Sequence, residues 1–471
     1  MRYLFFIISF CSIFYAKAQE RIITNESQQW HTEPSKKVKF PKGAKVEKVK
    51  VNINHPLQEI YGFGGSFNAL GYKALTLLPE QEQQQVMADL FSDEGTAFNL
   101  CRMPLGANDF SVRWYSFDEV NGDFELKHFN IEEDKKNLIP YIKFAKKYAP
   151  ELQVWASPWS PPMWMKHNRH YGGRATNMHW GPLYGDNMEE VYANNRFIME
   201  DRYLTTYANY FSKFISAYQQ EGIEIYSVQP QNEVQANQFF PSCVWTPQDL
   251  HRFTEDYLIP TLSNDHPEVS VLYGTLNMDS VEYVDVLMKN SKAQGVGVQW
   301  DGIESIEYIK KNYPKFEIMQ TESECNNGLN NWFTAEHTFD LLYTSFKQGA
   351  NSYMYWNMIL DDLGLSTWMW RQNSMISIDR YTQAVTYNPE YFIMKHFSHL
   401  IQKGAHMLSV DANKDLKVLA FQNPDGAITI VGGNTTDQDQ YLKLDIDGKN
   451  HKVILPAHSI LSLPFSQKIN H

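Results

Sequence analysis

Two apolar segments of this 471-residue chain end in a glutamate, and each has the length of a buried strand. One runs from Ile225 to Glu233 and finishes in Asn232-Glu233, and the other runs from Phe316 to Glu322. A charged group at the end of a buried strand is costly unless it has a partner or a chemical task. Two such carboxylates, about 5–5.5 Å apart, are what a retaining glycosidase uses as general acid/base and as nucleophile.

The residue types around these glutamates fit that chemistry. The carboxyl group that acts as the acid must stay protonated, so burial or the neighbouring charge has to raise its pKa. The carboxylate that acts as the nucleophile must stay ionised, and Arg102, which lies within an earlier apolar run, is a suitable cation. Asn232 can hydrogen-bond the sugar 2-hydroxyl. Because adjacent strand residues point to opposite faces, Asn232 and Glu233 can both reach the site only through a local distortion.

Tryptophans stand beside the ends of other apolar runs. Aromatic residues make up 14% of the chain, an amount that suits both a large core and a stacking surface for a sugar-like ligand. Together with Arg102, we expect three of them to surround the substrate: Trp159, Trp300 and Trp356.

Glu324 is an alternative to Glu322. The two residues share one strand face, so strand parity cannot choose between them. Glu322 ends the apolar run, and we therefore expect Glu324 to lie past the strand, paired or exposed. The other alternative, that either glutamate alone is a salt-bridged strand end, is weakened by the presence of both.

Other motifs indicate structure rather than chemistry. Gly62-Phe-Gly-Gly65 is too short a match for a phosphate-binding turn and indicates tight backbone packing. A metal site at His167, His170 and His179 is disfavoured, because these histidines flank a Gly-containing stretch typical of a surface loop. Only three cysteines follow the N-terminal segment, and we expect buried thiols or a single disulfide: Cys101, Cys243 and Cys325.

Eight apolar runs alternate with helical stretches such as 79–91, 135–147, 203–220 and 335–348, which predicts a (β/α)8 TIM barrel rather than a doubly wound sheet. In such a barrel the ends of the strands gather the site residues. The eight runs are 60–67, 97–106, 153–159, 225–233, 269–277, 296–300, 316–322 and 352–357.

The pattern changes near the C-terminus, where short strands are parted by turns and no helix intervenes. This predicts an appended antiparallel β-domain, which the alternating segment 44–53 joins. The expected organisation is a signal peptide at 1–18, an N-terminal segment at 19–58 that adds strands to the β-domain, the catalytic barrel at 59–398 and the β-sandwich domain at 399–471.

Charge and the first residues bear on partners and location. The net charge of −12 and the pI near 5.7 argue against nucleic acid or an anionic membrane surface as partner. Residues 1–18 are predicted to be a signal peptide, with an apolar core at 4–15 that is too short to span a membrane. A lipid anchor at Cys11 is not expected, because Phe10 precedes it. The protein is therefore expected to be secreted or periplasmic.

Six short motifs follow one another along the predicted barrel: Gly62-Phe-Gly-Gly-Ser66, Asn108-Asp-Phe-Ser-Val-Arg113, Ala156-Ser-Pro-Trp-Ser-Pro-Pro-Met-Trp164, Gln231-Asn-Glu233, Gln320-Thr-Glu322 and Tyr355-Trp-Asn357. In this order the chain resembles glycoside hydrolase family 30, the family of lysosomal glucosylceramidase and of bacterial and fungal β-1,6-glucanases. The resemblance implies a barrel with a β-sandwich built from both chain ends, retaining stereochemistry, and neither cofactor nor metal.

The same resemblance implies roles for single residues. By position, Glu233 would be the acid/base and Glu322 the nucleophile. Asp109 would grip two sugar hydroxyls. The subsite for the non-reducing sugar would be lined by Asp109, Trp159, Asn232 and Trp356.

Some segments depart from the glucosylceramidase pattern. The loop Ser323-Glu-Cys-Asn-Asn-Gly328 is longer and more polar, the segment 358–370 differs, and Gln299-Trp300-Asp301 lacks the tyrosine that many related barrels place beside the nucleophile. These loops look more like the bacterial β-1,6-glucanase branch. The sequence therefore predicts an exported retaining β-glycosidase, endo-acting on β-1,6-glucan. The alternatives are an exo-acting β-glucosidase, a glucosylceramidase-like enzyme or a β-xylosidase and, from another class, a carbohydrate-binding protein without catalysis.

Overall fold

The computed structural model describes residues 14–15, 20–34, 38–173 and 195–468. The chain divides into two compact units, Ile60–His399 and the combination of Met1–Glu59 with Leu400–His471. Apart from Phe14 and Tyr15, the predicted signal peptide lies outside the described residues. Across the described part of the chain, every helix is too short or too polar to cross a membrane.

The unit Ile60–His399 contains a closed barrel of eight parallel strands, which confirms the predicted (β/α)8 fold. Neighbouring strands in the barrel follow the order of the chain. The barrel strands are β5 (Gly62–Ser66), β6 (Leu100–Pro104), β7 (Gln153–Ser157), β8 (Ile225–Val228), β9 (Ser270–Leu276), β10 (Gly295–Gln299), β11 (Glu317–Glu322) and β12 (Ser352–Asn357).

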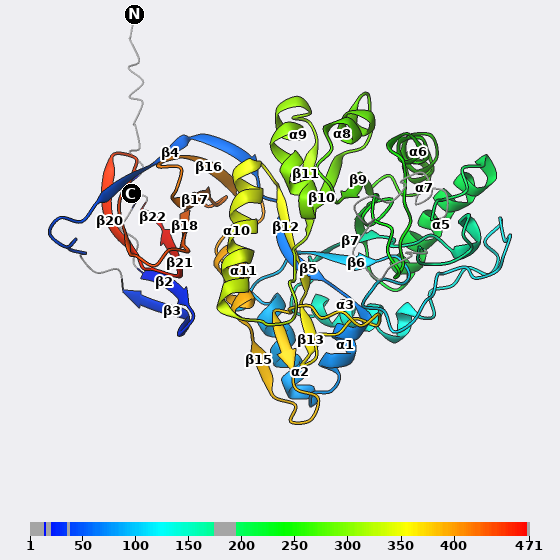
Figure 1. Ribbon diagram of the computed structural model, residues 1–471, viewed down its shortest axis with the longest axis horizontal. Coiled ribbons are helices and arrows are strands. Elements are labelled where there is room, and N and C mark those ends of the chain that lie inside the picture. Colours follow the sequence, from blue (N-terminus) through cyan, green and yellow to red (C-terminus); the bar gives the residue numbers. More distant parts are fainter. Residues whose placement is uncertain (1–13, 16–19, 35–37, 174–194, 469–471) are drawn as a thin grey trace, which may run out of the picture. The chain divides into compact units, whose positions relative to one another are not determined.

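Helices lie outside these strands, and Figure 1 shows α8 and α9 beside β10 and β11. The α-helices are α1 (Ala69–Leu75), α2 (Glu80–Phe91), α3 (Leu138–Lys146), α5 (Asp201–Gln220), α6 (Pro247–Phe253), α7 (Ile259–Asp265), α8 (Val281–Met288), α9 (Ile306–Asn312), α10 (Trp332–Gln348) and α11 (Pro389–Ser398). The other short elements are η1 (Asp134–Lys136), η2 (Met163–Met165), η3 (Thr254–Leu258), η4 (Trp300–Ser305), β13 (Ile359–Asp361), β14 (Ile376–Ile378) and β15 (Val385–Tyr387).

Local sequence explains why these helices form and end. In α5 the residues Tyr207, Phe211 and Phe214 recur every three to four positions and are buried, so one face of the helix packs inward. Helix α10 begins at a cap in which Asn331 accepts a hydrogen bond from the Thr334 N–H, and it ends at Gly349 with a φ of 126°.

Close backbone packing explains the glycines of the first barrel strand. A Cβ atom built on Gly64 would lie 1.9 Å from the carbonyl oxygen of Leu100 in β6. A side chain at this position would therefore force β5 and β6 apart. This geometry agrees with the interpretation of Gly62–Gly65 as a packing motif.

The second unit is a nine-stranded sheet that uses both ends of the chain, and it includes the predicted strand near residues 44–53. All neighbouring strands are antiparallel except β4 with β19, which are parallel. In spatial order the strands are β20 (Lys449–Leu455), β19 (Gln440–Ile446), β4 (Val46–Glu59), β16 (His406–Ala412), β17 (Lys417–Gln422), β18 (Ile428–Asn434), β21 (Ser459–Phe465), β2 (Glu20–Asn25) and β3 (Gln28–Pro34). A separate pair joins β1 (Phe14–Tyr15) to β22 (Gln467–Lys468).

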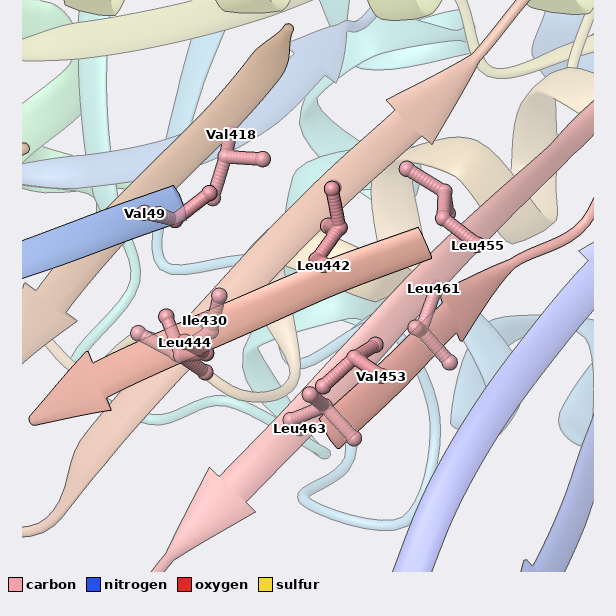
Figure 2. Close-up of a pocket in the computed structure, with 10 residues that line it drawn as sticks. Val49, Val418, Ile430, Leu442, Leu444, Val453, Leu455, Leu461 and Leu463 are labelled. Atoms are coloured by element: carbon pink, nitrogen blue, oxygen red, sulfur yellow. The ribbon is translucent and has the colours of Figure 1, made fainter. Parts of the chain in front are cut away.

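This sheet curves until its two halves face each other around an apolar interior. A Cβ atom on Gly432 in β18 would lie 3.4 Å from a methyl group of Leu455 in β20, although four strands separate them in the sheet. Figure 2 shows the side chains that fill this interior. The labelled residues are Val49, Val418, Ile430, Leu442, Leu444, Val453, Leu455, Leu461 and Leu463.

Candidate active site

Glu322 and Glu233 both reach the mouth of the barrel, by different routes. Glu322 is the last residue of β11 and is 6% exposed. Glu233 lies beyond the end of β8 and is partly exposed. Strands β9 and β10 separate β8 from β11 around the barrel.

The predicted strand 225–233 was too long, because β8 ends at Val228. Pro230 has no N–H for a strand ladder, and the backbone then becomes irregular. Glu233 takes a left-handed φ of 49°, and its N–H donates to Thr275 Oγ1 at 2.8 Å. The N–H of Asn232 donates to the Pro158 carbonyl at 2.7 Å. The distortion that the sequence required is present, and it brings Asn232 and Glu233 to the same side.

Arg102 ties three strand ends together beneath the site. Its guanidinium donates to a Glu322 carboxylate oxygen at 2.7 Å, to Asn232 Oδ1 at 2.6 Å and to Ser157 Oγ at 2.9 Å. The side chain is fully buried and lies over the Trp159 ring, 4.3 Å from its centroid. A buried carboxylate that accepts a charge-assisted bond from arginine is held in its ionised form.

Gln299, the last residue of β10, lies between the two carboxylates. Its amide nitrogen is 3.2 Å from Glu322 Oε2, 3.3 Å from Asn232 Oδ1 and 3.5 Å from Glu233 Oε1. Glu322 Oε2 and Glu233 Oε1 therefore lie no further apart than the sum of their distances to this nitrogen. That bound is compatible with the spacing of about 5–5.5 Å that retaining glycosidases use.

The electrostatic environments of the two glutamates differ. Burial, followed by the negative charge of Glu322, raises the pKa of Glu233 to about 8, and Arg102 opposes this shift. Burial also raises the pKa of Glu322, but the direct ion pair and hydrogen bond with Arg102 counteract it. Asp109, which is 5% exposed, has a pKa raised well above its ordinary value by burial and then by Glu322. The arrangement thus favours a proton on Glu233 and a charge on Glu322.

An open cleft of about 470 Å³ lies above these groups. Of the residues predicted from sequence, Asp109, Trp159, Asn232 and Trp300 line it together with both glutamates. The other lining residues are Gln235, Ala236, Gln238, Phe240, Asn277, Met278, Asp301, Trp370 and Gln372.

Two predicted substrate contacts, Arg102 and Trp356, are not among the lining residues. Arg102 has no exposed surface and holds Glu322 and Asn232 from below. Trp356 is 1% exposed and packs behind Trp159, with ring centroids 5.3 Å apart. In this structure both residues support the lining instead of forming it.

Sequence reasoning missed the aromatic pair that joins the loops after β8 and β12. The rings of Phe240 and Trp370 lie 4.6 Å apart, and Phe239 lies 5.3 Å from Trp370. On its other side the loop after β12 reaches the loop after β6, where the Thr367 N–H donates to the Asp109 carbonyl at 3.2 Å. The position of Phe240 and Trp370 after predicted strand ends was the available signal. Nothing in the sequence, however, shows that two residues 130 positions apart are in contact.

The competing candidates lie apart from the cleft. Glu324 is ion-paired with His337 of α10 at 3.0 Å and does not line the cleft, as expected for a residue beyond the strand. The ring nitrogen Nδ1 of His170 contacts the backbone of Gly172, and His179 lies outside the described residues. In the described part of the chain the three cysteines are buried and unpaired: Cys101, Cys243 and Cys325.

Comparison with known proteins places this chain in a family. The family model described as "Glycosyl hydrolase family 30 TIM-barrel domain" matches residues 60–401. The model described as "Glycosyl hydrolase family 30 beta sandwich domain" matches residues 404–463. The chain is 26% identical to the lysosomal acid glucosylceramidase of Mus musculus, over 86% of this chain and 80% of that protein. It is 23% identical to the endo-1,6-beta-D-glucanase BGN16.3 of Trichoderma harzianum, over 86% and 83%.

Among solved structures, that of SrfJ from Salmonella typhimurium has the same fold. Its TM-score is 0.83 at 21% identity, with 95% of this chain and 99% of that chain covered. The family descriptions together span the barrel and most of the C-terminal part of the sheet unit. The chain therefore belongs to glycosyl hydrolase family 30 and is a glycosidase with that family's TIM barrel and β-sandwich.

Proposed function

We propose that this glycosidase retains anomeric configuration and uses Glu322 as nucleophile and Glu233 as general acid/base. The observation that carries this proposal is the asymmetry of the pair: Glu322 is bonded to Arg102 at 2.7 Å, whereas the pKa of Glu233 is raised to about 8. An ionised carboxylate can attack, and a protonated one can donate.

In the first step Glu322 attacks the anomeric carbon while Glu233 gives its proton to the departing glycosidic oxygen. The products of this step are a glycosyl ester on Glu322, a free alcohol and an ionised Glu233. In the second step Glu233 takes a proton from water, whose oxygen attacks the anomeric carbon and releases Glu322. Asp109, Trp159 and Asn232 surround the position of the sugar that reacts.

We propose β-1,6-linked glucan as the substrate, cleaved within the chain. The name of the Trichoderma harzianum relative supports this choice. So do the polar groups and the aromatic ring that Asn277, Trp300 and Asp301 add to the lining of the cleft, where they can contact the sugars of a leaving chain. Stacking on aromatic faces and hydrogen bonds from such groups are how proteins hold sugar rings.

Exo-acting release of single glucose units is a second candidate, and the low exposure of part of the cleft lining favours it. Asp109 and Trp159 are 5% and 2% exposed, whereas Met278, which also lines the cleft, is 46% exposed. The loop after β12 contacts both Phe240 and the backbone of Asp109, so it lies beside this weakly exposed part of the lining. The greater identity to the mouse glucosylceramidase points the same way.

Product analysis separates the two candidates. Purified protein is incubated with linear β-1,6-glucan, with a β-1,4-xylan and with a β-1,6-linked glucose disaccharide, and early products are resolved by chromatography. A ladder of oligosaccharides supports cleavage within the chain, and glucose alone supports exo action. Release from xylan only would overturn both candidates. NMR of the first product tests the mechanism, which requires the β-anomer to form before mutarotation.

A further inference from the structure

Gln299 is the side chain that links the two carboxylates. Among the described residues it is the one group that hydrogen-bonds both Glu322 and Glu233. It has no exposed surface and does not line the cleft. Any effect on the reaction must therefore pass through the glutamates and not through contact with the sugar.

The orientation of this amide is fixed by its neighbours. Its oxygen accepts from Thr321 Oγ1 at 2.8 Å and lies 3.4 Å from Arg102 Nη1. Arginine can only donate, so the atom facing it must be the amide oxygen. The NH2 group is consequently directed at the carboxylates, and a flip of the amide would place two donors against each other.

The NH2 group has two hydrogens and three acceptors within reach, at 3.2 Å, 3.3 Å and 3.5 Å. One acceptor is therefore left without a hydrogen at any moment. The shortest of these contacts is to Glu322, which also carries the ion pair with Arg102. The longest is to Glu233, whose raised pKa keeps it protonated before the reaction.

We propose that Gln299 is a positioning residue whose N–H donation passes from Glu322 to Glu233 as negative charge moves between them. The inference rests on the proposed roles of the two glutamates. When Glu322 becomes a neutral ester, it becomes a weaker acceptor, while Glu233 has just become a carboxylate and a stronger one. A neutral donor shared by both sites stabilises the charged partner in each step without adding charge of its own.

The sign of the expected pH effect follows from this role. A hydrogen bond to an ionised carboxylate lowers its pKa, so removing the donor raises the pKa of Glu322 and of Glu233. Glu322 must be ionised, and the acidic limb of kcat/KM therefore moves to higher pH. Glu233 must be protonated, so the alkaline limb moves to higher pH as well. Mere loosening of the site, which would admit water, lowers both pKa values and moves the limbs in the opposite direction.

The test compares Gln299→Met, which keeps side-chain length and removes the donor, with the wild type on an aryl β-glucoside across pH. We expect both limbs to rise by roughly one pH unit and kcat/KM to fall roughly 10- to 100-fold. Gln229→Met is the matched control. Gln229 is equally buried inside the barrel, and its amide nitrogen hydrogen-bonds the sulfur of Met319 at 3.6 Å and neither glutamate, so the limbs of this variant should stay in place.

Gln299→Asn, which keeps the amide but withdraws it by one methylene, should move the limbs in the same direction by less; it also serves if Gln299→Met does not fold. Unchanged limbs in a folded Gln299 variant, or limbs that move to lower pH, overturn the inference while the proposed function stands. A wild type without β-glycosidase activity, or a fully active Glu322→Gln, overturns the proposed function first.

Discussion

The residues around Glu322 and Glu233 favour opposite protonation states of the two carboxyl groups. Glu322 faces the guanidinium of Arg102, whereas Glu233 is bonded to neutral donors and stands close to another carboxylate. The difference lies in the partners that the fold supplies and not in burial, which raises the pKa of both glutamates. The proposed roles of Glu322 as nucleophile and of Glu233 as protonated acid rest on that difference.

Glu322 and Glu324 can be separated by one pair of substitutions. Glu322→Gln should lower kcat/KM by roughly 10⁴-fold or more on every substrate, because the covalent step is lost. Glu324→Gln should retain activity within a few-fold, since Glu324 pairs with His337 away from the cleft. Initial rates on an aryl β-glucoside measure the activity of both variants. An inactive Glu324→Gln beside an active Glu322→Gln would reverse the assignment.

Removal of the acid should depend on the leaving group. Glu233→Ala should barely slow the first step for a dinitrophenyl glucoside, which needs no protonation, and should slow an alkyl glucoside by roughly 10²- to 10⁴-fold. Added azide should restore turnover of the activated substrate and yield a β-glycosyl azide. Equal losses on the two substrates would contradict the acid role.

The raised pKa of Glu233 also predicts a cost in stability. Its folded pKa of about 8 exceeds the ordinary value of 4.5, so its stabilising contribution is complete below about pH 4.5 and is lost as pH rises to about 8. Glu233→Gln should therefore unfold at a higher temperature than the wild type at pH 8, with little difference at pH 4.5. Thermal unfolding at both pH values checks this. Equal Tm values of Glu233→Gln and the wild type at pH 8 would contradict this prediction, because ionisation of Glu233 would then cost no stability.

At the scale of elements, the alternation of eight apolar runs with helical stretches was enough to predict the barrel. Strand β11 ends at Glu322 as predicted, because nothing interrupts its apolar run. Pro230 was a sequence signal for the early end of β8. The left-handed backbone of Glu233 was not predictable, since it is held by a hydrogen bond to Thr275 from the next strand. Gln299 was visible as a strand-end residue, but its bonds to both glutamates are set by tertiary structure.

Thr275 tests whether the distortion after β8 matters. Thr275→Val removes the oxygen that accepts the Glu233 N–H and lies 3.3 Å from Asn232 Oδ1. We expect kcat/KM to fall roughly 10-fold, because the N–H of Glu233 loses its partner and the glutamate shifts. Thr275→Ser keeps the oxygen and should stay near wild type. Equal losses in both variants would point to packing and not to this hydrogen bond.

At the scale of the whole molecule, the sequence was enough to predict where the alternating strands and helices of the barrel give way to a domain of short strands connected by turns. The alternating pattern of segment 44–53 likewise predicted a strand with one buried face that joins this unit. The parallel pairing of β4 with β19 was not predictable, because both orientations bury the same alternate residues. The sequence also did not show which loops meet over the barrel, since those contacts join residues far apart in the chain.

The interior of the sheet unit gives the last prediction. Leu444 is 2% exposed and faces the small apolar space in which both halves of the sheet meet (Figure 2). Leu444→Ala should lower the free energy of unfolding of this unit by about 2–5 kcal/mol, because a cavity replaces buried methyl groups. The neighbouring Lys443 is exposed, so Lys443→Ala is the control and should change it by less than about 0.5 kcal/mol. Urea unfolding of both variants measures the difference, and similar midpoints would show that the two halves of the sheet do not depend on this packing.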